Sequence, residues 1–251
     1  FLFFIEFPRY YLLEYGVLAY RAMTANSRGR KRTLARWLLE QDHPLVSILV
    51  PGKNEGKNIF KLVTTLREQT YQNFEIIVID DGSDDETPLI CRDLERAHYI
   101  SKYLRCDLRG GKASATNFGA NMAQGKYLIC LDADSSLDRQ AIENVLIPFY
   151  LDPKVKAVGG CVLVRNYKDT ICSSLQGYEY LKRIQVGRLV TVQLGIYHII
   201  SGAFGAFDAE TLKQVGYWDI GPGLDGDITQ KVRKAGHRVA FAHDAVCLTN
   251  V

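Results

Sequence analysis

Apolar residues from His43 onward fall into two alternating patterns. Short apolar runs such as 46–51 are typical of buried strands, whereas segments such as 57–69 repeat their apolar residues at helical spacing. The same alternation predicts strands at 75–80, 103–106 and 127–131, with helices around 84–97 and 112–124. A strand–helix–strand rhythm of this kind favours an α/β fold with a mainly parallel sheet flanked by helices.

The second half of the chain is less regular. We predict a strand near 155–164, a long helical region around 170–190, and a segment of small residues from Ser201 to Ala206. No internal repeat or low-complexity linker separates the halves. We therefore interpret the second half as an extension of the same domain.

The first 22 residues form an apolar, aromatic segment that contains Pro8 and four charged residues. A basic cluster at Arg28, Arg30, Lys31 and Arg32 follows, as expected where a chain leaves lipid on the cytoplasmic side or lies on an anionic leaflet. We expect residues 1–42 to form a membrane-associated or interfacial helix with a basic linker, and residues 43–251 to form the main domain. The alternative is an amphipathic helix packed against that domain, followed by a solvated basic loop.

The charge balance and the spacing of Cys and His residues argue against a nucleic-acid partner and a structural zinc site. Lys and Arg number 31 and Asp and Glu 28, and this small charge excess gives no reason to expect a nucleic-acid partner. The six cysteines include no C-x-x-C pair, and the histidines are equally dispersed, so a structural zinc site is not expected. We interpret the cysteines as reduced core residues of a cytosolic domain.

Carboxylates follow two of the predicted strands. Asp80 and Asp81 begin the sequence Asp-Asp-Gly-Ser, where they could bind a nucleobase and ribose or act as ordinary turn residues. Asp132 and Asp134 follow a strongly apolar strand, and such close like charges repel each other unless a cation intervenes. Mg²⁺ or Mn²⁺ bridging them to a diphosphate would neutralise them, although a surface turn remains the alternative. Because ligands of open α/β sheets bind at the carboxyl ends of strands, both motifs should converge there.

Two further motifs could complete a site for a phosphorylated sugar. Gly110-Gly111-Lys112 precedes a predicted helix, so backbone amides and one ammonium could face the same anion. The sequence has neither a G-x-x-x-x-G-K-[ST] loop nor a G-x-G-x-x-G motif after its first strand. Asp225 and Asp227 precede a helical run at 228–235, where a carboxylate could cap the helix or serve as a general base.

Taken in order, these motifs resemble those of family 2 glycosyltransferases, most closely the processive cellulose, chitin, hyaluronan and poly-N-acetylglucosamine synthases. The matching segments are Pro51-x-x-Asn54-Glu55, Asp80-Asp81-Gly82-Ser83, Gly110-Gly111-Lys112-Ala113, Asp132-Ala133-Asp134, Ser201-Gly202-Ala203-Phe204 and Asp225. The resemblance extends from about residue 44 to the end of the chain.

This resemblance implies a GT-A fold, with a Rossmann-like sheet and a membrane-proximal N-terminal helix, and a metal-dependent, inverting hexosyltransferase. A nucleotide-diphosphate sugar, favoured as UDP-linked, would be the donor, and a growing β-linked polysaccharide the acceptor. The residues implied to bind the nucleotide or donor are Glu55, Asp80, Asp81, Lys112 and Asp132, and those implied to bind Mg²⁺ or Mn²⁺ are Asp134 and Asp132. The residues implied to bind the acceptor are Ser201, Gly202, Ala203 and Phe204. Asp225 is the implied catalytic base. The implied location is the cell membrane, with the domain on its cytoplasmic side and accessory membrane subunits as further candidate partners.

Two departures from the family pattern keep alternatives open. Leu224 stands where such enzymes usually have Glu before the catalytic Asp, and the chain ends at Val251, before the Gln-x-x-Arg-Trp motif and later membrane helices. We expect either a portion of a larger protein or a non-processive enzyme. The alternatives are a transferase to a polyprenyl phosphate or other lipid, and an inactive assembly subunit. A nucleotidyltransferase would be expected to have a basic, glycine-rich loop after its first strand, whereas 52–56 is short and contains an acid.

Overall fold

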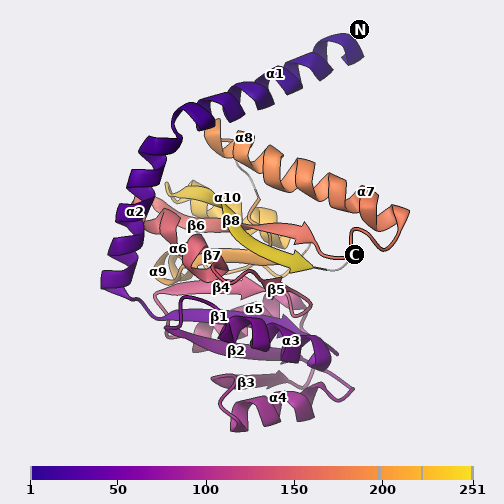
Figure 1. Cartoon of the computed structure of the whole chain (residues 1–251). Helices are drawn as coiled ribbons and strands as arrows, with labels where there is room; N and C mark the ends of the chain where they lie inside the picture. Colours follow the sequence, from indigo (N-terminus) through magenta and orange to yellow (C-terminus); the bar gives the residue numbers. More distant parts are fainter. Residues whose placement is uncertain (1, 197–198, 222, 250–251) are drawn as a thin grey trace.

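The computed structural model of the chain describes residues 2–196, 199–221 and 223–249, with side chains from Tyr11 onward. One eight-stranded sheet runs through the described residues in the order β3-β2-β1-β4-β7-β6-β8-β5 (Figure 1). Its strands are β1 (Val46–Gly52), β2 (Phe74–Asp81), β3 (Lys102–Cys106), β4 (Tyr127–Leu131), β5 (Ser136–Leu137), β6 (Val155–Val164), β7 (Phe204–Asp208) and β8 (Arg238–Thr249).

Helices cover the sheet and extend beyond it at the N-terminus (Figure 1). They are α1 (Leu2–Met23), α2 (Ala25–Asp42), α3 (Gly56–Arg67), α4 (Thr87–Arg96), α5 (Lys112–Met122), α6 (Ala141–Leu151), α7 (Ile171–Tyr180), the π-helical segment η1 (Leu181–Gly187), α8 (Arg188–Gln193), α9 (Ala209–Gln214) and α10 (Leu224–Lys234). The expected α/β class with a mainly parallel sheet is confirmed.

Alternate residues of β1 belong to two separate apolar cores. Ile48 and Val50 face a core that includes α3 and α6, whereas Leu49 faces a second core that includes α5 and α10. All three side chains are completely buried. Since successive side chains of a strand point to opposite faces, β1 is an interior strand whose sheet is covered on both faces, in a three-layer arrangement.

The sheet combines parallel and antiparallel pairs, and this mixture shapes its carboxyl edge. Strand β1 pairs in parallel with β2 and β4, and β2 pairs in parallel with β3. Strand β7 runs antiparallel to β4, with Phe204 opposite Leu131. The start of β7 therefore lies at the same edge as the ends of β1, β2 and β4.

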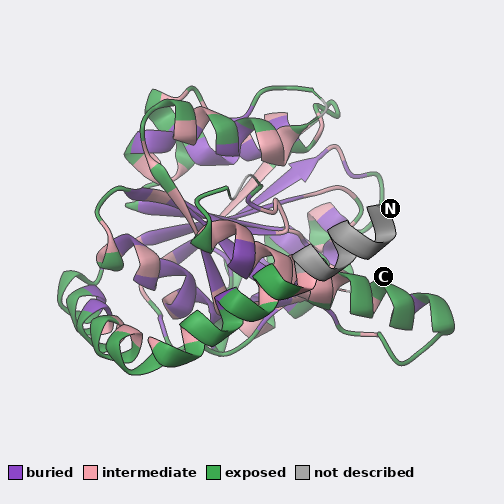
Figure 2. Ribbon diagram, turned by 90° about the horizontal axis from the view of Figure 1, so that it is seen from above, coloured by how far each residue is buried: buried purple, intermediate pink, exposed green. Residues whose placement is uncertain are grey.

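The basic cluster expected in a linker lies in helix α2. Ala35 and Leu39, four residues apart on this helix, are 2% and 1% exposed and belong to the core that includes α6. The outer side of α2 and much of α1 beyond Tyr11 are exposed (Figure 2). None of the helices in the described part of the chain is both long and apolar enough to cross a membrane.

Candidate active site

The carboxyl edge of the sheet brings the segment 201–204 beside Asp132. Leu131 and Phe204 are register partners, and the amide of Asp132 donates a hydrogen bond to the Ala203 carbonyl at 3.4 Å. This contact follows from the antiparallel direction of β7, because the residues that enter β7 must lie next to those that leave β4. Two motifs separated by about seventy residues in sequence thus become neighbours.

Lys112, Asp132, Gly202 and Asp225 form one hydrogen-bonded cluster at this edge. The Lys112 ammonium forms an ion pair with the Asp132 carboxylate and lies 3.5 Å from the Gly202 carbonyl oxygen. The Gly202 amide donates to Oδ2 of Asp225 at 2.7 Å. The start of α5, the end of β4 and the first turn of α10 therefore meet around one glycine.

Gly202 and Asp225 approach so closely that position 202 has no room for a side chain. A Cβ atom on Gly202 would lie 2.4 Å from Oδ1 of Asp225. The Thr229 hydroxyl strengthens the same junction: it donates to the Asp225 carbonyl at 2.6 Å and accepts from the Ile200 amide at 3.0 Å. Helix α10 is thus fixed to the segment before β7 through both side-chain and backbone groups.

Helix α10 begins earlier than the sequence pattern indicated. It starts at Leu224, and its N-cap residue is Gly223, in the left-handed conformation with φ 101°. Asp225 and Asp227 lie within the first turn, so neither occupies the cap position. A carboxylate in the first turn still interacts favourably with the positive end of the helix dipole.

Burial is the main influence on the Asp132 carboxyl. It raises the pKa of Asp132, and the neighbouring charges of Asp134 and Asp225 act in the same direction. The Lys112 ammonium opposes these effects through its charge and its hydrogen bond. Asp134 is exposed, and its Oδ2 accepts a hydrogen bond from the Thr249 hydroxyl at 3.3 Å. An added cation would therefore stabilise the ionised form of Asp132.

The two carboxylates Asp132 and Asp134 suit a divalent ion that is shared with a ligand. In the described part of the chain, no three or more His, Cys, Asp or Glu side chains gather to hold a metal ion on their own. Mg²⁺ is usually bound through one or two carboxylates together with substrate phosphates rather than by an all-protein cage. The donor set therefore fits Mg²⁺ or Mn²⁺ bound jointly with a diphosphate.

Asp81 holds the segment that leads into α5. Its two carboxylate oxygens accept hydrogen bonds from the amides of Gly110 and Gly111, at 2.7 and 2.9 Å. The side chain is nearly buried, with 6% exposure for the residue. Asp81 thereby fixes the position from which Lys112 reaches Asp132.

Asp80 is even more deeply buried and has three partners. Its carboxylate accepts from the Ser83 amide at 2.7 Å, the Tyr103 hydroxyl at 2.6 Å and the Arg105 guanidinium at 3.1 Å. The sequence pattern did not identify Tyr103 or Arg105. The parallel register of β2 and β3 places Arg105 opposite Asp80, and neither segment's own sequence pattern contains this pairing.

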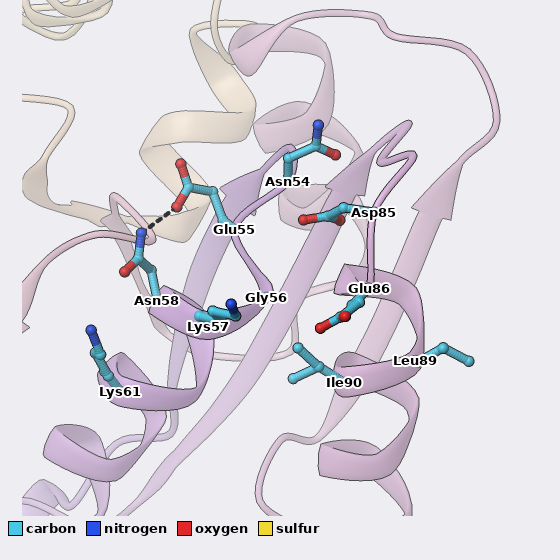
Figure 3. A pocket seen from close by; sticks show the side chains of 10 residues that line it. All are labelled: Asn54, Glu55, Gly56, Lys57, Asn58, Lys61, Asp85, Glu86, Leu89 and Ile90. Atoms are coloured by element: carbon cyan, nitrogen blue, oxygen red, sulfur yellow. Dashed lines mark hydrogen bonds between the residues drawn. The ribbon is translucent and has the colours of Figure 1, made fainter.

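Glu55 lies at a turn apart from the Lys112–Asp225 cluster. Its carboxylate accepts from the Asn58 side-chain Nδ2 at 2.6 Å, at the rim of an open groove that also contains Lys57 and Lys61 (Figure 3). The neighbouring Asn54 exchanges two hydrogen bonds with Asp84, at 2.7 and 3.1 Å. These bonds join the turn after β1 to the turn after β2.

The segment 201–204 differs in exposure along its length. Ser201, Gly202 and Ala203 are half-buried, whereas Phe204 is completely buried. The Phe204 ring lies against Gly160 of β6, where a Cβ atom would be 2.1 Å from the ring. The accessible surface of this segment therefore belongs to its first three residues.

Comparisons with known proteins show which family the chain resembles. Residues 47–216 match the family model described as glycosyl transferase family 2. A poly-β-1,6-N-acetyl-D-glucosamine synthase of Staphylococcus epidermidis is 34% identical over 185 residues, which cover 72% of this chain and 44% of that protein. The Staphylococcus aureus protein of the same name is 32% identical over 204 residues, covering 80% of this chain and 49% of its own length. The chain thus spans about half the length of these relatives.

Solved structures agree on the fold. A mannosyltransferase from Pyrobaculum calidifontis in complex with GDP-Man and Mn²⁺ has a TM-score of 0.68 and 26% identity, covering 95% of this chain and 69% of that one. GalNAc-T7 with UDP, GalNAc and Mn²⁺ has a TM-score of 0.66 at 17% identity, with 83% of this chain and 44% of that chain covered, and supports the fold alone. Both are GT-A glycosyltransferases, so the expected GT-A fold is confirmed. The chain belongs to glycosyl transferase family 2.

Proposed function

We propose that this chain carries the catalytic site of an inverting glycosyltransferase that moves a sugar from a UDP-linked donor to a growing β-linked polysaccharide. The observation that carries this proposal is the cluster around Gly202. It joins Asp225, a carboxylate suited to accept a proton, to the Lys112–Asp132 pair, which is suited to a diphosphate. The acceptor hydroxyl group would lie at Asp225 and the departing diphosphate at the Lys112–Asp132 pair, on opposite sides of the reacting carbon.

On the donor side, Lys112 would contact the diphosphate, while Asp81, Asp80 and Glu55 would hold the nucleotide directly or through the turns that they fix. Asp81 and Asp80 are already positioned by hydrogen bonds, which supports a preorganised site. A divalent ion on Asp134 and Asp132 would supply positive charge to the departing diphosphate.

On the acceptor side, Asp225 would remove the proton from the attacking hydroxyl group. Its Oδ2 is occupied by the Gly202 amide, whereas Oδ1 accepts no hydrogen bond from the residues described. As the acceptor oxygen forms its bond to the anomeric carbon, the bond from that carbon to the diphosphate oxygen breaks. This single displacement inverts the configuration, and Ser201, Gly202 and Ala203 would contact the acceptor.

For the sugar itself, we propose N-acetylglucosamine. Support comes from the named activity of the relatives that are 32–34% identical. The GDP-Man bound to the mannosyltransferase makes GDP-mannose the appropriate competing donor.

We extend the proposal to a location at the cytoplasmic face of the cell membrane. Exposed apolar side chains on α1 and α7 support it, among them Leu12 at 73%, Met23 at 85%, Ile171 at 83% and Leu175 at 66% exposure. Figure 1 shows both helices at the same end of the molecule. A surface of this kind suits the interface of a bilayer.

Replacement of Asp225 by Asn tests the proposed base. Asn keeps an oxygen that can accept from the Gly202 amide but cannot take up the proton, so we expect donor binding to persist while turnover falls by about 10²–10⁴-fold. The measurement is release of nucleoside diphosphate by the protein in membranes, with UDP-N-acetylglucosamine or GDP-mannose and Mg²⁺ or Mn²⁺.

Asp227→Asn is the matched control, because Asp227 is an exposed carboxylate in the same helical turn. It should retain nearly full turnover. Equal activity of wild type and Asp225→Asn would refute the role of Asp225. Failure to bind or turn over either donor with either metal would favour an assembly subunit. Transfer confined to a lipid phosphate would exclude the polysaccharide acceptor.

A further inference from the structure

A second pocket lies away from the carboxyl edge, between helices α1, α2 and α6 and strand β8. Its volume is about 510 Å³, and it is bounded by cationic residues of α1 and α2 on one side and by Ile147, Pro148 and Leu151 of α6 on another. Residues 241–244 of β8 form the remaining wall. The pocket therefore combines an apolar side with a strongly basic one.

The positive charge of this pocket exceeds its negative charge. Arg21, Arg28, Lys31 and Arg32 line it, and Asp244 is the one carboxylate among the lining residues that the structure describes. Asp244 forms an ion pair with Arg32, which also donates to the Asn144 side chain at 2.8 Å. Among the described residues, no carboxylate forms an ion pair with Arg21 or Arg28.

Arg21 and Arg28 are half-buried and lie close together. The Arg28 guanidinium donates to the backbone carbonyl of Arg21, while its Nε is buried without a hydrogen-bond partner in the described structure. Burial, followed by the charge of Arg28, lowers the pKa of Arg21. Burial also lowers the pKa of His243, 3.5 Å from the Arg21 guanidinium, despite the opposing charge of Asp244. An anion in this pocket would relieve the repulsion between Arg21 and Arg28.

We propose that this pocket binds a phosphate-bearing amphiphile, with its phosphate between Arg21 and Arg28 and its apolar part against α6. Guanidinium groups bind phosphate strongly through charge-assisted hydrogen bonds. The apolar side explains why an amphiphile fits better than a free anion, since Leu151 remains 47% exposed at the pocket. This site would be separate from the proposed donor site and independent of the donor's identity.

The test compares Arg28→Gln with Arg30→Gln in the full protein. Both remove one charge from the same part of α2, but Arg30 is exposed and does not line the pocket. The probe is dihexanoyl phosphatidylglycerol below its micelle concentration, measured by calorimetry in a neutral detergent. We expect Arg28→Gln to weaken binding by about tenfold or more, as for loss of a charged hydrogen bond, and Arg30→Gln by less than about twofold.

Two further arms separate the possible ligands. Leu151→Gln should weaken binding of the lipid but leave binding of inorganic phosphate unchanged. Phosphate that binds as tightly as the lipid would overturn the amphiphile and identify a free-anion site. Equal losses in the two arginine variants, or no lipid binding by wild type, would overturn the pocket itself. Arg21→Gln provides a second variant if Arg28→Gln does not fold, as judged by its thermal unfolding.

Discussion

Among single residues, Gly202 has the strictest steric requirement in the cluster. Replacement by Ala would place a methyl group 2.4 Å from Asp225 Oδ1, so the carboxylate or the backbone must move. We expect Gly202→Ala to cost about 1–3 kcal/mol of stability, as overpacking does, and to reduce turnover because Asp225 is displaced. Chemical denaturation and the rate of nucleoside diphosphate release measure the two effects.

Gly226→Ala is the control for this substitution. Gly226 lies next to Asp225 on α10, and a Cβ atom there would meet no atom within 4 Å. Helix propensity favours Ala over Gly by about 1 kcal/mol, so this variant should be at least as stable as wild type. Wild-type turnover in Gly202→Ala would show that the close contact with Asp225 is unnecessary.

Residue types in the sequence indicated which side chains carry charge at the site, but not the contacts between them. Lys112, Asp132 and Asp225 stood out because each occupies an expected loop or helix start. Tyr103 and Thr229 did not, because Tyr103 contacts Asp80 on another strand and Thr229 contacts Ile200, which lies outside α10. Asp80 contacts Tyr103 only after β2 and β3 have paired, and a pattern within one segment contains no information about such pairing.

Among the elements, α9 has a well-defined N-cap in Asp208. Burial would raise the pKa of Asp208, but hydrogen bonds from the Thr211 hydroxyl and amide, and from Lys156, outweigh burial and lower it. We expect Asp208→Ala to reduce the free energy of unfolding by about 0.5–2 kcal/mol at neutral pH.

This stabilisation should depend on pH in a defined direction. Because the folded pKa of Asp208 is lowered, its contribution is complete above the unfolded pKa of about 4 and is lost as pH falls through the folded value. Denaturant unfolding of wild type and Asp208→Ala between pH 7 and pH 2 should show the difference shrinking in acid. A difference that grew in acid would contradict the hydrogen-bond account.

The sequence predicted the elements of the first half within a few residues. In the second half it predicted β6, the helical region 171–193 and most of α10, but it missed α6 and β7. Strands such as β4 alternate with helices that have one apolar face, so the pattern is clear. Helix α6 was not predicted, because it is apolar on most sides and contains Pro148. Strand β7 was not predicted, because it begins within a run of small residues. Its antiparallel direction cannot be read from the local sequence pattern.

In the whole molecule, α2 joins the N-terminal part of the chain to the core. We expect Leu39→Ala to destabilise the domain by about 2–5 kcal/mol, because Leu39 is 1% exposed and its loss leaves a cavity. Leu34→Ala, on the same helix but 58% exposed, should change stability by less than about 0.5 kcal/mol. Thermal or denaturant unfolding checks both, and equal effects would indicate that α2 does not pack as described.

The position of β7 beside β4 also sets an order of events during synthesis. Strands β1, β2, β3 and β4 are complete once residue 131 has been made, and they can pair in parallel without any later segment. Strand β4 lacks its second neighbour until residue 208 has left the ribosome. During translation of the intervening residues, β4 is an open edge, and such edges are sites of misassembly. Slowing or pausing of translation between these points would prolong the interval in which a nascent chain depends on chaperones.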